Sequence, residues 1–310
     1  MQYQFPSRRE SVFVLAALAV WLVVTGTCIG FRPEHPLMAL LIAGLFFASQ
    51  TTRKLVTALL PFILFAVSYD WMNLLPNYKV NPVDTQGLYE AEKSLFGILT
   101  SDGQLTPNEF FARHTSVVMD FMAGVFYLCW VPVPILFGLW LYYDGQRREY
   151  LHFSWVFLLV NLIGFAGYYI HPAAPPWYIA HHGFDVVFDT PGEVAGLGAF
   201  DEMTGLTVFH GLYARNANVF AAVPSLHSAY MLIAFIYALR ARTSLGLRIL
   251  FGIIACGIWL TAVYTSHHYL IDVLLGTSCT LLGVALFEGV LMKWGPFRRW
   301  IDRYTTYIEK

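Results

Sequence analysis

Hydrophobic residues are grouped along the chain in long runs, and short polar segments separate them. A helix of about 20 residues crosses the roughly 30 Å hydrocarbon core of a bilayer. Seven runs approach or exceed this length, and a shorter run at 36–50 makes an eighth; the seven are 11–30, 55–76, 115–143, 150–170, 219–239, 245–265 and 268–292. Because lipid cannot satisfy open backbone groups, we predict an all-α integral membrane protein with about eight transmembrane helices.

The segment 81–98 between two runs has a different pattern. Its apolar positions recur at helical spacing, at Leu88, Ala91, Leu95 and Ile98. Its charged positions fall elsewhere, at Glu90, Glu92 and Lys93. This pattern predicts an amphipathic helix at the membrane interface, with a solvated connector as the alternative.

The remaining polar segments complete the domain organisation. No internal repeat or linker interrupts the chain, so we predict one membrane domain over 1–310. It has N-terminal helices in 1–54, a core in 55–292 with an outer loop at 171–218, and a basic tail at 293–310. We expect that amphipathic tail to lie on anionic lipid headgroups.

Composition agrees with a membrane protein. The chain is 57% hydrophobic and 13% charged, against roughly 25% charged residues in a soluble domain. Its net charge of −1 argues against a nucleic-acid partner.

The four cysteines all lie in apolar runs without metal-ligand spacing, at Cys28, Cys129, Cys256 and Cys279. The first run is longer than the apolar core of a signal peptide and is interpreted as a retained anchor.

The distribution of cations predicts the orientation. With the N-terminus inside and eight spans, fourteen Lys and Arg fall in the inner segments and five in the outer ones. This asymmetry favours cytoplasmic termini. It also places His227, His268 and the loop 171–218 at the outer face, which is the periplasm if the membrane is a bacterial inner membrane, as we expect, or a lumen in a eukaryote.

Two short motifs carry the candidate chemistry. They are P-S-L-H-S at 224–228 and H-H-Y-L-I-D at 267–272. Ionisable side chains at bilayer depth are costly, so they indicate a functional site. His268 and Asp272 are four residues apart on one helical face. The carboxylate can therefore hold one ring nitrogen while the other faces a substrate.

These residues suit the transfer of a phosphate group. Ser225 can cap the helix that begins at His227, and exposed N–H groups at such a helix start favour an anion. His268, oriented by Asp272, has the form of a nucleophile that becomes a phosphohistidine. His227 would protonate the leaving alkoxide and later accept a proton from the acceptor. Water as acceptor would make a phosphatase, and a lipid alcohol a transferase.

Other roles for the same residues remain open. His227, His268 and Asp272 could form a facial metal triad, or could merely satisfy one another between helices. A channel or transporter is disfavoured, because its ionisable residues would lie deeper along a path. His267 is interpreted as a neighbour of the site. Four histidines read as loop or interface residues (His152, His181, His182 and His210), and Asp120 and Asn161 are expected to make interhelical hydrogen bonds.

With these motifs, the chain resembles the type 2 phosphatidic acid phosphatase superfamily and, within it, the inositol phosphorylceramide synthase branch of fungi and bacterial relatives. The resemblance covers roughly residues 70–290 and includes A-P-P-W-Y at 174–178 and P-G-E-V-A-G-L-G-A-F-D at 191–201. It implies a six-helix catalytic core and phosphotransfer without a metal or other cofactor through His268, Asp272 and His227. It also implies transfer of inositol phosphate from phosphatidylinositol, the phospholipid donor, to a ceramide-type lipid alcohol, with release of diacylglycerol.

The substrate-binding residues are less complete. Pro176, Trp177 and Tyr178 belong to a proline-stiffened loop whose aromatic residues favour the headgroup zone, and we expect them to form a pocket wall. The K-x6-R-P element of the resembled superfamily is not visible, and Ala262 stands where that superfamily has an arginine. Arg215, in the outer loop before His227, is therefore our predicted cation for the phosphate, with Ser225 beside it.

Overall fold

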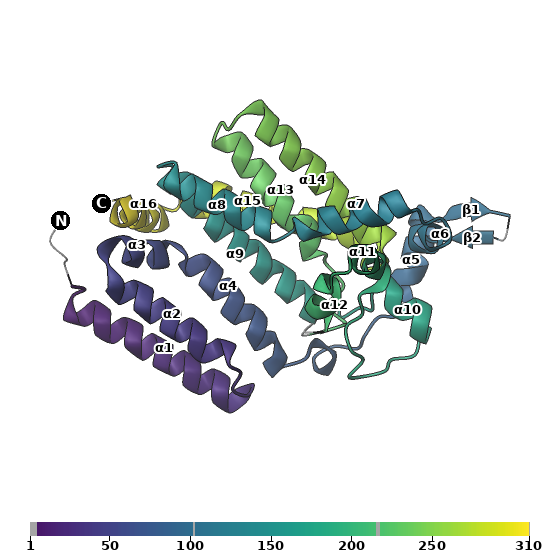
Figure 1. The fold of residues 1–310 in the computed structure, drawn as a ribbon, viewed down its shortest axis with the longest axis horizontal. Coiled ribbons are helices and arrows are strands. Elements are labelled where there is room, and N and C mark those ends of the chain that lie inside the picture. Colours follow the sequence, from purple (N-terminus) through teal and green to yellow (C-terminus); the bar gives the residue numbers. More distant parts are fainter. Residues whose placement is uncertain (1–4, 102, 215–217, 310) are drawn as a thin grey trace.

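The computed structural model describes residues 5–101, 103–214 and 218–309. Apolar helices make up most of it (Figure 1); they are α1 (Arg8–Cys28), α2 (Glu34–Ala48), α3 (Gln50–Ala58), α4 (Leu60–Trp71), α7 (Val117–Leu128), α8 (Pro132–Tyr143), α9 (Arg147–Ile170), α13 (Leu226–Arg240), α14 (Leu245–Tyr264) and α15 (Leu270–Gly289). Shorter helices connect them or follow them, namely α5 (Gly87–Phe96), α6 (Pro107–Arg113), α10 (Pro176–His182), α11 (Gly198–Thr204), α12 (Val208–Tyr213) and α16 (Gly295–Glu309). Single 3-10 turns are η1 (Met72–Leu74), η2 (Asn77–Lys79), η3 (Ala195–Leu197) and η4 (Leu291–Lys293).

The apolar helices are those of an integral membrane protein, but they do not reproduce eight uninterrupted spans. In the described residues, four helices are long and apolar enough to cross a bilayer: α1, α9, α14 and the stretch from α15 through η4. Two bent pairs raise the number to six if each pair is one span. The helices α2 and α13 are apolar but shorter. The predicted count of eight is therefore not confirmed.

Three predicted runs differ from the observed helices. Two of them bend near prolines, and the third becomes helical later than predicted. The run 115–143 bends by 40° between α7 and α8, and the run 55–76 bends by 51° between α3 and α4. Proline occupies the first or second position of α4 and α8, where a missing N–H costs nothing but a continuous helix would lose a hydrogen bond. The run 219–239 becomes helical only at Leu226, so its predicted boundary was wrong.

The core of the helical body lies around α9. Thirteen of its 24 residues are buried, and it packs against α4, α8, α13 and α15. Two predicted interhelical hydrogen bonds are confirmed. Tyr230 donates to Asn161 at 2.6 Å between α13 and α9, and the Tyr264 hydroxyl donates to Asp120 between α14 and α7.

The predicted amphipathic segment 81–98 is helical over Gly87–Phe96, but its pattern misplaced one residue. Glu92 in α5 is fully buried, although the sequence pattern put it on the polar face, while Leu95 is exposed. After α5 the chain forms an antiparallel hairpin of β1 (Ile98–Thr100) and β2 (Gly103–Leu105), which an all-α prediction missed.

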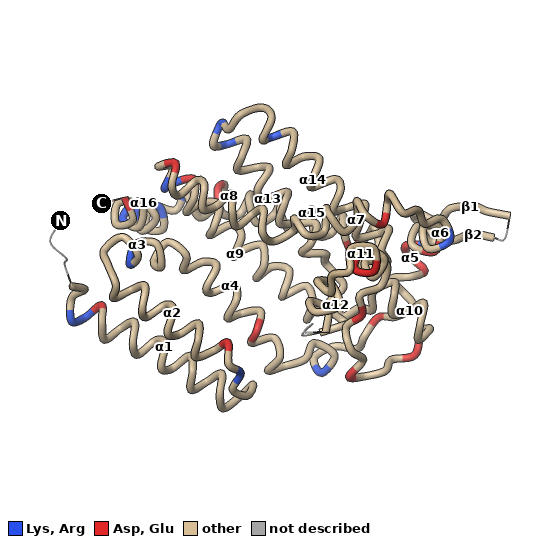
Figure 2. Tube along the Cα trace, viewed as in Figure 1, with Lys and Arg blue, Asp and Glu red and all other residues tan. Residues whose placement is uncertain are grey.

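The tail forms the helix α16, and one face of it packs on protein. Ile301, Tyr304 and Ile308 are buried, and the Tyr304 hydroxyl donates to the carbonyl of Thr57 in α3. The chain ends lie at the same end of the molecule (Figure 1). Most Lys and Arg residues gather at that end, while Asp and Glu dominate around α5, α10 and α11 at the other (Figure 2).

Candidate active site

The two histidine motifs meet where α13 and α15 begin. The backbone N–H of Ser225 donates to the carbonyl of Asp272 at 2.9 Å. Gly276, one turn after Asp272 in α15, permits this approach, because a Cβ there would lie 2.0 Å from the Ser225 carbonyl oxygen. The glycine therefore lets the helix that begins beside His227 touch the helix that carries Asp272.

His227, His268 and Asp272 form a contact series across this junction. The His227 Nδ1 lies 3.0 Å from the His268 Nε2. On the other side of the same ring, the His268 Nδ1 lies 3.4 Å from Asp272 Oδ2. Asp272 is fully buried and its Oδ2 accepts the Tyr269 N–H at 2.9 Å. The structure thus brings together the three residues that the motifs predicted to be catalytic.

The His268–Asp272 contact is looser than a hydrogen bond. Within the described residues, neither the His268 Nδ1 nor Asp272 Oδ1 has a hydrogen-bond partner. Both atoms are nonetheless buried. Asp272 is nevertheless the carboxylate that faces this ring nitrogen, which is the position from which a carboxylate orients a nucleophilic histidine.

Residues that the sequence did not single out hold the two histidines in place. The His227 ring packs on Trp130 and Tyr127, with centroids 4.3 and 5.0 Å away. The Asn108 amide of α6 donates to the carbonyls of Val263 and His268 at 2.8 and 2.9 Å. No sequence signal marks these residues, because their partners are more than 90 positions away in the chain.

His267 is a neighbour of the site, as interpreted from the sequence. Its Nδ1 lies 3.0 Å from the Thr265 hydroxyl, and its ring packs on Tyr213 with centroids 4.4 Å apart. Burial and, to a smaller extent, the nearby His268 together lower the pKa of His267 to about 3. His267 is therefore uncharged at neutral pH and faces an aromatic side chain rather than Asp272.

Ser225 does not make the predicted cap. It occupies the N-cap position of α13, but its side chain forms no capping hydrogen bond, and its buried Oγ has no partner among the described residues. Its backbone turns toward Asp272 instead. The start of α13 consequently has no cap from the Ser225 side chain, and its first N–H, that of Leu226, meets the Tyr168 hydroxyl.

Trp177 and Tyr178 occupy different surroundings. The Trp177 N–H donates to the carbonyl of Ser266, two residues before His268, and its side chain lines a cavity of about 580 Å³ together with Glu193 and His210. The Tyr178 hydroxyl instead accepts the Val187 N–H at 2.7 Å, and its ring is fully buried. Pro176 is the first residue of α10 and is buried. Of the three, Trp177 alone is among the residues that line this cavity.

Several histidines read as isolated have carboxylate partners. His210 contacts Asp201, and His181 contacts Glu193. His152 contacts Glu288 at the opposite end of the helical body. These contacts give each histidine a structural role in its own surroundings. None of these pairs includes a second histidine.

The site contains three predicted catalytic residues, but a cation that could bind the phosphate is not identified among the ion pairs that the structure describes for Asp272. In the part of the chain that the structure describes, no Lys or Arg forms an ion pair with Asp272. The predicted cation, Arg215, lies outside the described residues.

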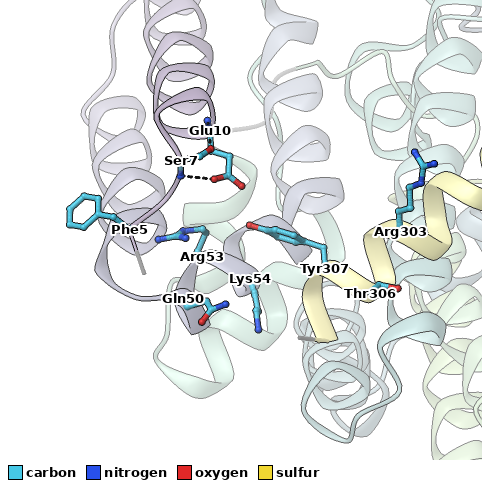
Figure 3. Close-up of a pocket in the computed structure, with 9 residues that line it drawn as sticks. All are labelled: Phe5, Ser7, Glu10, Gln50, Arg53, Lys54, Arg303, Thr306 and Tyr307. Carbon is cyan, nitrogen blue, oxygen red and sulfur yellow. Dashed lines mark hydrogen bonds between the residues drawn. The ribbon is translucent and has the colours of Figure 1, made fainter. Parts of the chain in front are cut away.

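A cavity of about 620 Å³ with Arg53, Lys54 and Arg303 at its wall lies between α3, the start of α1 and α16 (Figure 3), at the other end of the molecule.

The comparisons with known proteins agree on one family. The sequence model of the family described as PAP2 superfamily matches residues 98–286. A protein of Bacteroides thetaiotaomicron named phosphoinositol dihydroceramide synthase is 58% identical over 304 residues, which cover 98% of this chain and all of that protein.

More distant similarity extends to fungi. The catalytic subunit of inositol phosphorylceramide synthase from Saccharomyces cerevisiae is 25% identical over 79% of this chain and 59% of its own length. An inositol phosphorylceramide synthase of Candida albicans is 29% identical over 64% of this chain and 42% of its own length. The chain thus spans about half the length of these fungal relatives. No solved structure matches the chain.

Proposed function

Because the chain belongs to the PAP2 superfamily, we propose that it is a membrane phosphotransferase that moves inositol phosphate from phosphatidylinositol to a ceramide-type lipid alcohol. The Bacteroides relative supports this activity, since the similarity extends over its full length. The contact series His227, His268, Asp272 is the observation within this structure that carries the proposal.

We assign a step to each of the three residues, and the contact series supports this assignment. His268 Nε2 attacks the phosphorus of the donor, so that a P–N bond forms and the P–O bond to diacylglycerol breaks. His227 gives its proton to the departing alkoxide. In the second step the acceptor hydroxyl gives its proton to His227 while its oxygen attacks the phosphorus and the P–N bond breaks. Asp272, on the far side of the His268 ring, stabilises the positive charge that the imidazole acquires.

The site must open for this reaction. The ring nitrogens of His227 and His268 that contact each other at 3.0 Å are the two that the mechanism uses. The phosphate must therefore separate them. The start of α13, where the Ser225 side chain makes no cap, is the proposed place for the phosphate oxygens, with the N–H groups that follow Leu226 as the donors. Arg215 remains the proposed cation, and Ser225 and Trp177 the proposed contacts for the substrate.

The finer architecture also belongs to this proposal. We infer one membrane domain in which the bent pairs α3–α4 and α7–α8 act as single spans, and in which α2 and α13 cross with help from flanking residues. A six-helix core would then comprise the spans from α3–α4 to α15. Cationic residues at the end with both termini support a cytoplasmic location for that end and a periplasmic one for the histidines, as in a bacterial inner membrane.

Labelled head groups test the activity. Purified protein in detergent receives phosphatidylinositol labelled in its inositol, with and without ceramide. We expect the label to move to ceramide and diacylglycerol to appear in equal amount. Release of free inositol phosphate at the same rate with and without ceramide would instead identify a hydrolase that uses water as the acceptor.

A reporter of topology tests the orientation separately. Single cysteines placed beside His227 and His268 should react with an impermeant reagent from the same side of sealed vesicles. Labelling of the two positions from opposite sides would exclude their joint action.

A further inference from the structure

The start of α15 is held by a carboxylate from outside the spanning helices. Glu92, on the interfacial helix α5, is fully buried. Its two carboxylate oxygens accept the N–H groups of Leu270 at 2.9 Å and Ile271 at 3.1 Å. These are the first two residues of α15, where N–H groups lack helical partners and the helix dipole favours a negative charge.

Asp272 completes the same turn. It is the third residue of α15, and its Oδ2 accepts the N–H of Tyr269, the residue before the helix. Two carboxylates thus share three consecutive N–H groups, those of residues 269–271. Loss of the bonds to Glu92 would free the backbone on which Asp272 sits, and Asp272 Oδ2 is the atom that faces His268 at 3.4 Å.

The helix α5 belongs to a segment that makes hydrogen bonds to both sides of the loop between α14 and α15, which contains His268. We call residues 87–113, which contain α5, the hairpin and α6, the clamp segment. Its parts are tied together, because Gln104 donates to the Lys93 carbonyl at 2.9 Å and Tyr89 donates to Glu109 at 2.8 Å. Glu92 holds the backbone after His268, and Asn108 holds the carbonyl of His268 itself. The loop between α14 and α15, with His268 in it, is therefore held in place by elements outside these two helices.

The chemistry of position 92 requires a carboxylate. Burial raises the pKa of Glu92, and the N–H groups of Leu270 and Ile271 act in the opposite direction by stabilising the charged form. Glutamine has the same shape but only one acceptor oxygen, and its amide N–H₂ would face a backbone N–H. Burial of an acidic group costs free energy unless hydrogen bonds compensate it, as the two backbone N–H groups do here. Its presence here points to a role in fixing the site.

We propose that Glu92 is a positioning residue for the phosphotransfer. It fixes the first turn of α15 and thereby the orientation of Asp272 toward His268. It also occupies the N–H groups of Leu270 and Ile271, which would otherwise be open to the substrate phosphate. This inference rests on the proposed function.

The test compares two glutamates of the same helix in the full chain. Glu92→Gln should lower kcat about 10- to 100-fold with KM within about twofold, because the reacting groups are misaligned while substrate contacts remain. Glu90→Gln is the matched control: Glu90 is exposed and accepts from Gln86 at 2.6 Å, so kcat should not change. Glu92→Asp keeps the charge with a shorter reach, and its kcat should fall between the two.

A second measurement does not depend on activity. Hydrogen exchange of a peptide covering residues 266–275 should accelerate at least about tenfold in Glu92→Gln and not in Glu90→Gln, because the capped N–H groups are released. Unchanged exchange in that peptide would overturn the proposal even if the wild-type protein transferred no inositol phosphate. A wild-type-like kcat in Glu92→Gln, or a rise in KM alone, would overturn it in an active protein. If Glu92→Gln fails to fold, the same two readouts on Glu92→Asp decide.

Discussion

The helix α15 contacts a histidine near each of its ends, and the two contacts differ in their surroundings. Near its C-terminus Glu288 lies 2.9 Å from His152 Nδ1, accepts the Tyr237 hydroxyl at 2.6 Å and pairs with Arg240 at 3.0 Å. Near its N-terminus Asp272 faces His268 at 3.4 Å with one oxygen unpartnered among the described residues, and a second histidine follows.

The comparison shows that a histidine beside a carboxylate is not by itself evidence of catalysis. The Glu288 charge is neutralised by an arginine, and its oxygen is already shared by three donors. Such a pair ties α9, α13 and α15 together. The Asp272 pair leaves a ring nitrogen of His268 facing His227, where we propose that the phosphate enters. The second histidine at 3.0 Å and the lack of an arginine on the carboxylate, within the described residues, distinguish the proposed reactive pair.

Removal of the proposed nucleophile should have the largest effect. His268→Ala is expected to lower kcat for transfer of inositol phosphate at least about 10⁴-fold, since the covalent route is lost. His152→Ala, the corresponding change at the other pair, should leave kcat within about twofold. The assay is transfer of labelled head group by purified protein. Equal losses in both variants would remove the functional distinction between the two ends.

Removal of His227 should have a smaller effect that depends on the donor. His227→Ala should lower kcat about 10²- to 10⁴-fold with phosphatidylinositol, because the alkoxide would leave without a proton. With a nitrophenyl phosphodiester donor, whose leaving group is stable without protonation, the first step should be lowered less than tenfold. Measuring release of nitrophenol in a single turnover checks this. An equal loss with both donors would contradict the acid role of His227.

The pair at the other end should matter for stability. His152→Ala leaves the Glu288 oxygen without one donor and creates a small cavity, and we expect a loss of about 1–3 kcal/mol. Thermal unfolding in detergent should show this as a lower Tm than in the wild-type protein. A Tm equal to that of the wild type would mean that the pair contributes nothing to the junction of α9 and α15.

A chelator should have the smallest effect. The proposed chemistry uses imidazole, carboxylate and backbone N–H groups, so excess EDTA should leave kcat unchanged within error. The measurement is transfer activity after dialysis against the chelator. Activity that disappears and returns with a divalent ion would instead support the metal triad that His227, His268 and Asp272 could form.

Much of this site could be predicted from local sequence. His268 and Asp272 are neighbours because a helical turn joins positions four apart. The apolar runs predict helices because lipid cannot satisfy open backbone groups. The same reasoning found α5 but misplaced Glu92, because helical periodicity separates faces without identifying a buried polar partner. It also failed where the chain bends, since a proline within a uniformly apolar run does not reveal how far the helix turns.

The sequence by itself determined the membrane class, the two histidine motifs and the family, because these depend on local composition and on residues close together in the chain. Only the tertiary structure decided which polar residues support them. Glu92 and Leu270 are 178 positions apart, and Asn108 and His268 are 160 apart. Such contacts form when packing of the whole helical body brings separate segments to one place, and no local pattern encodes that distance. For the same reason, only the structure could separate the Asp272 pair from the Glu288 pair.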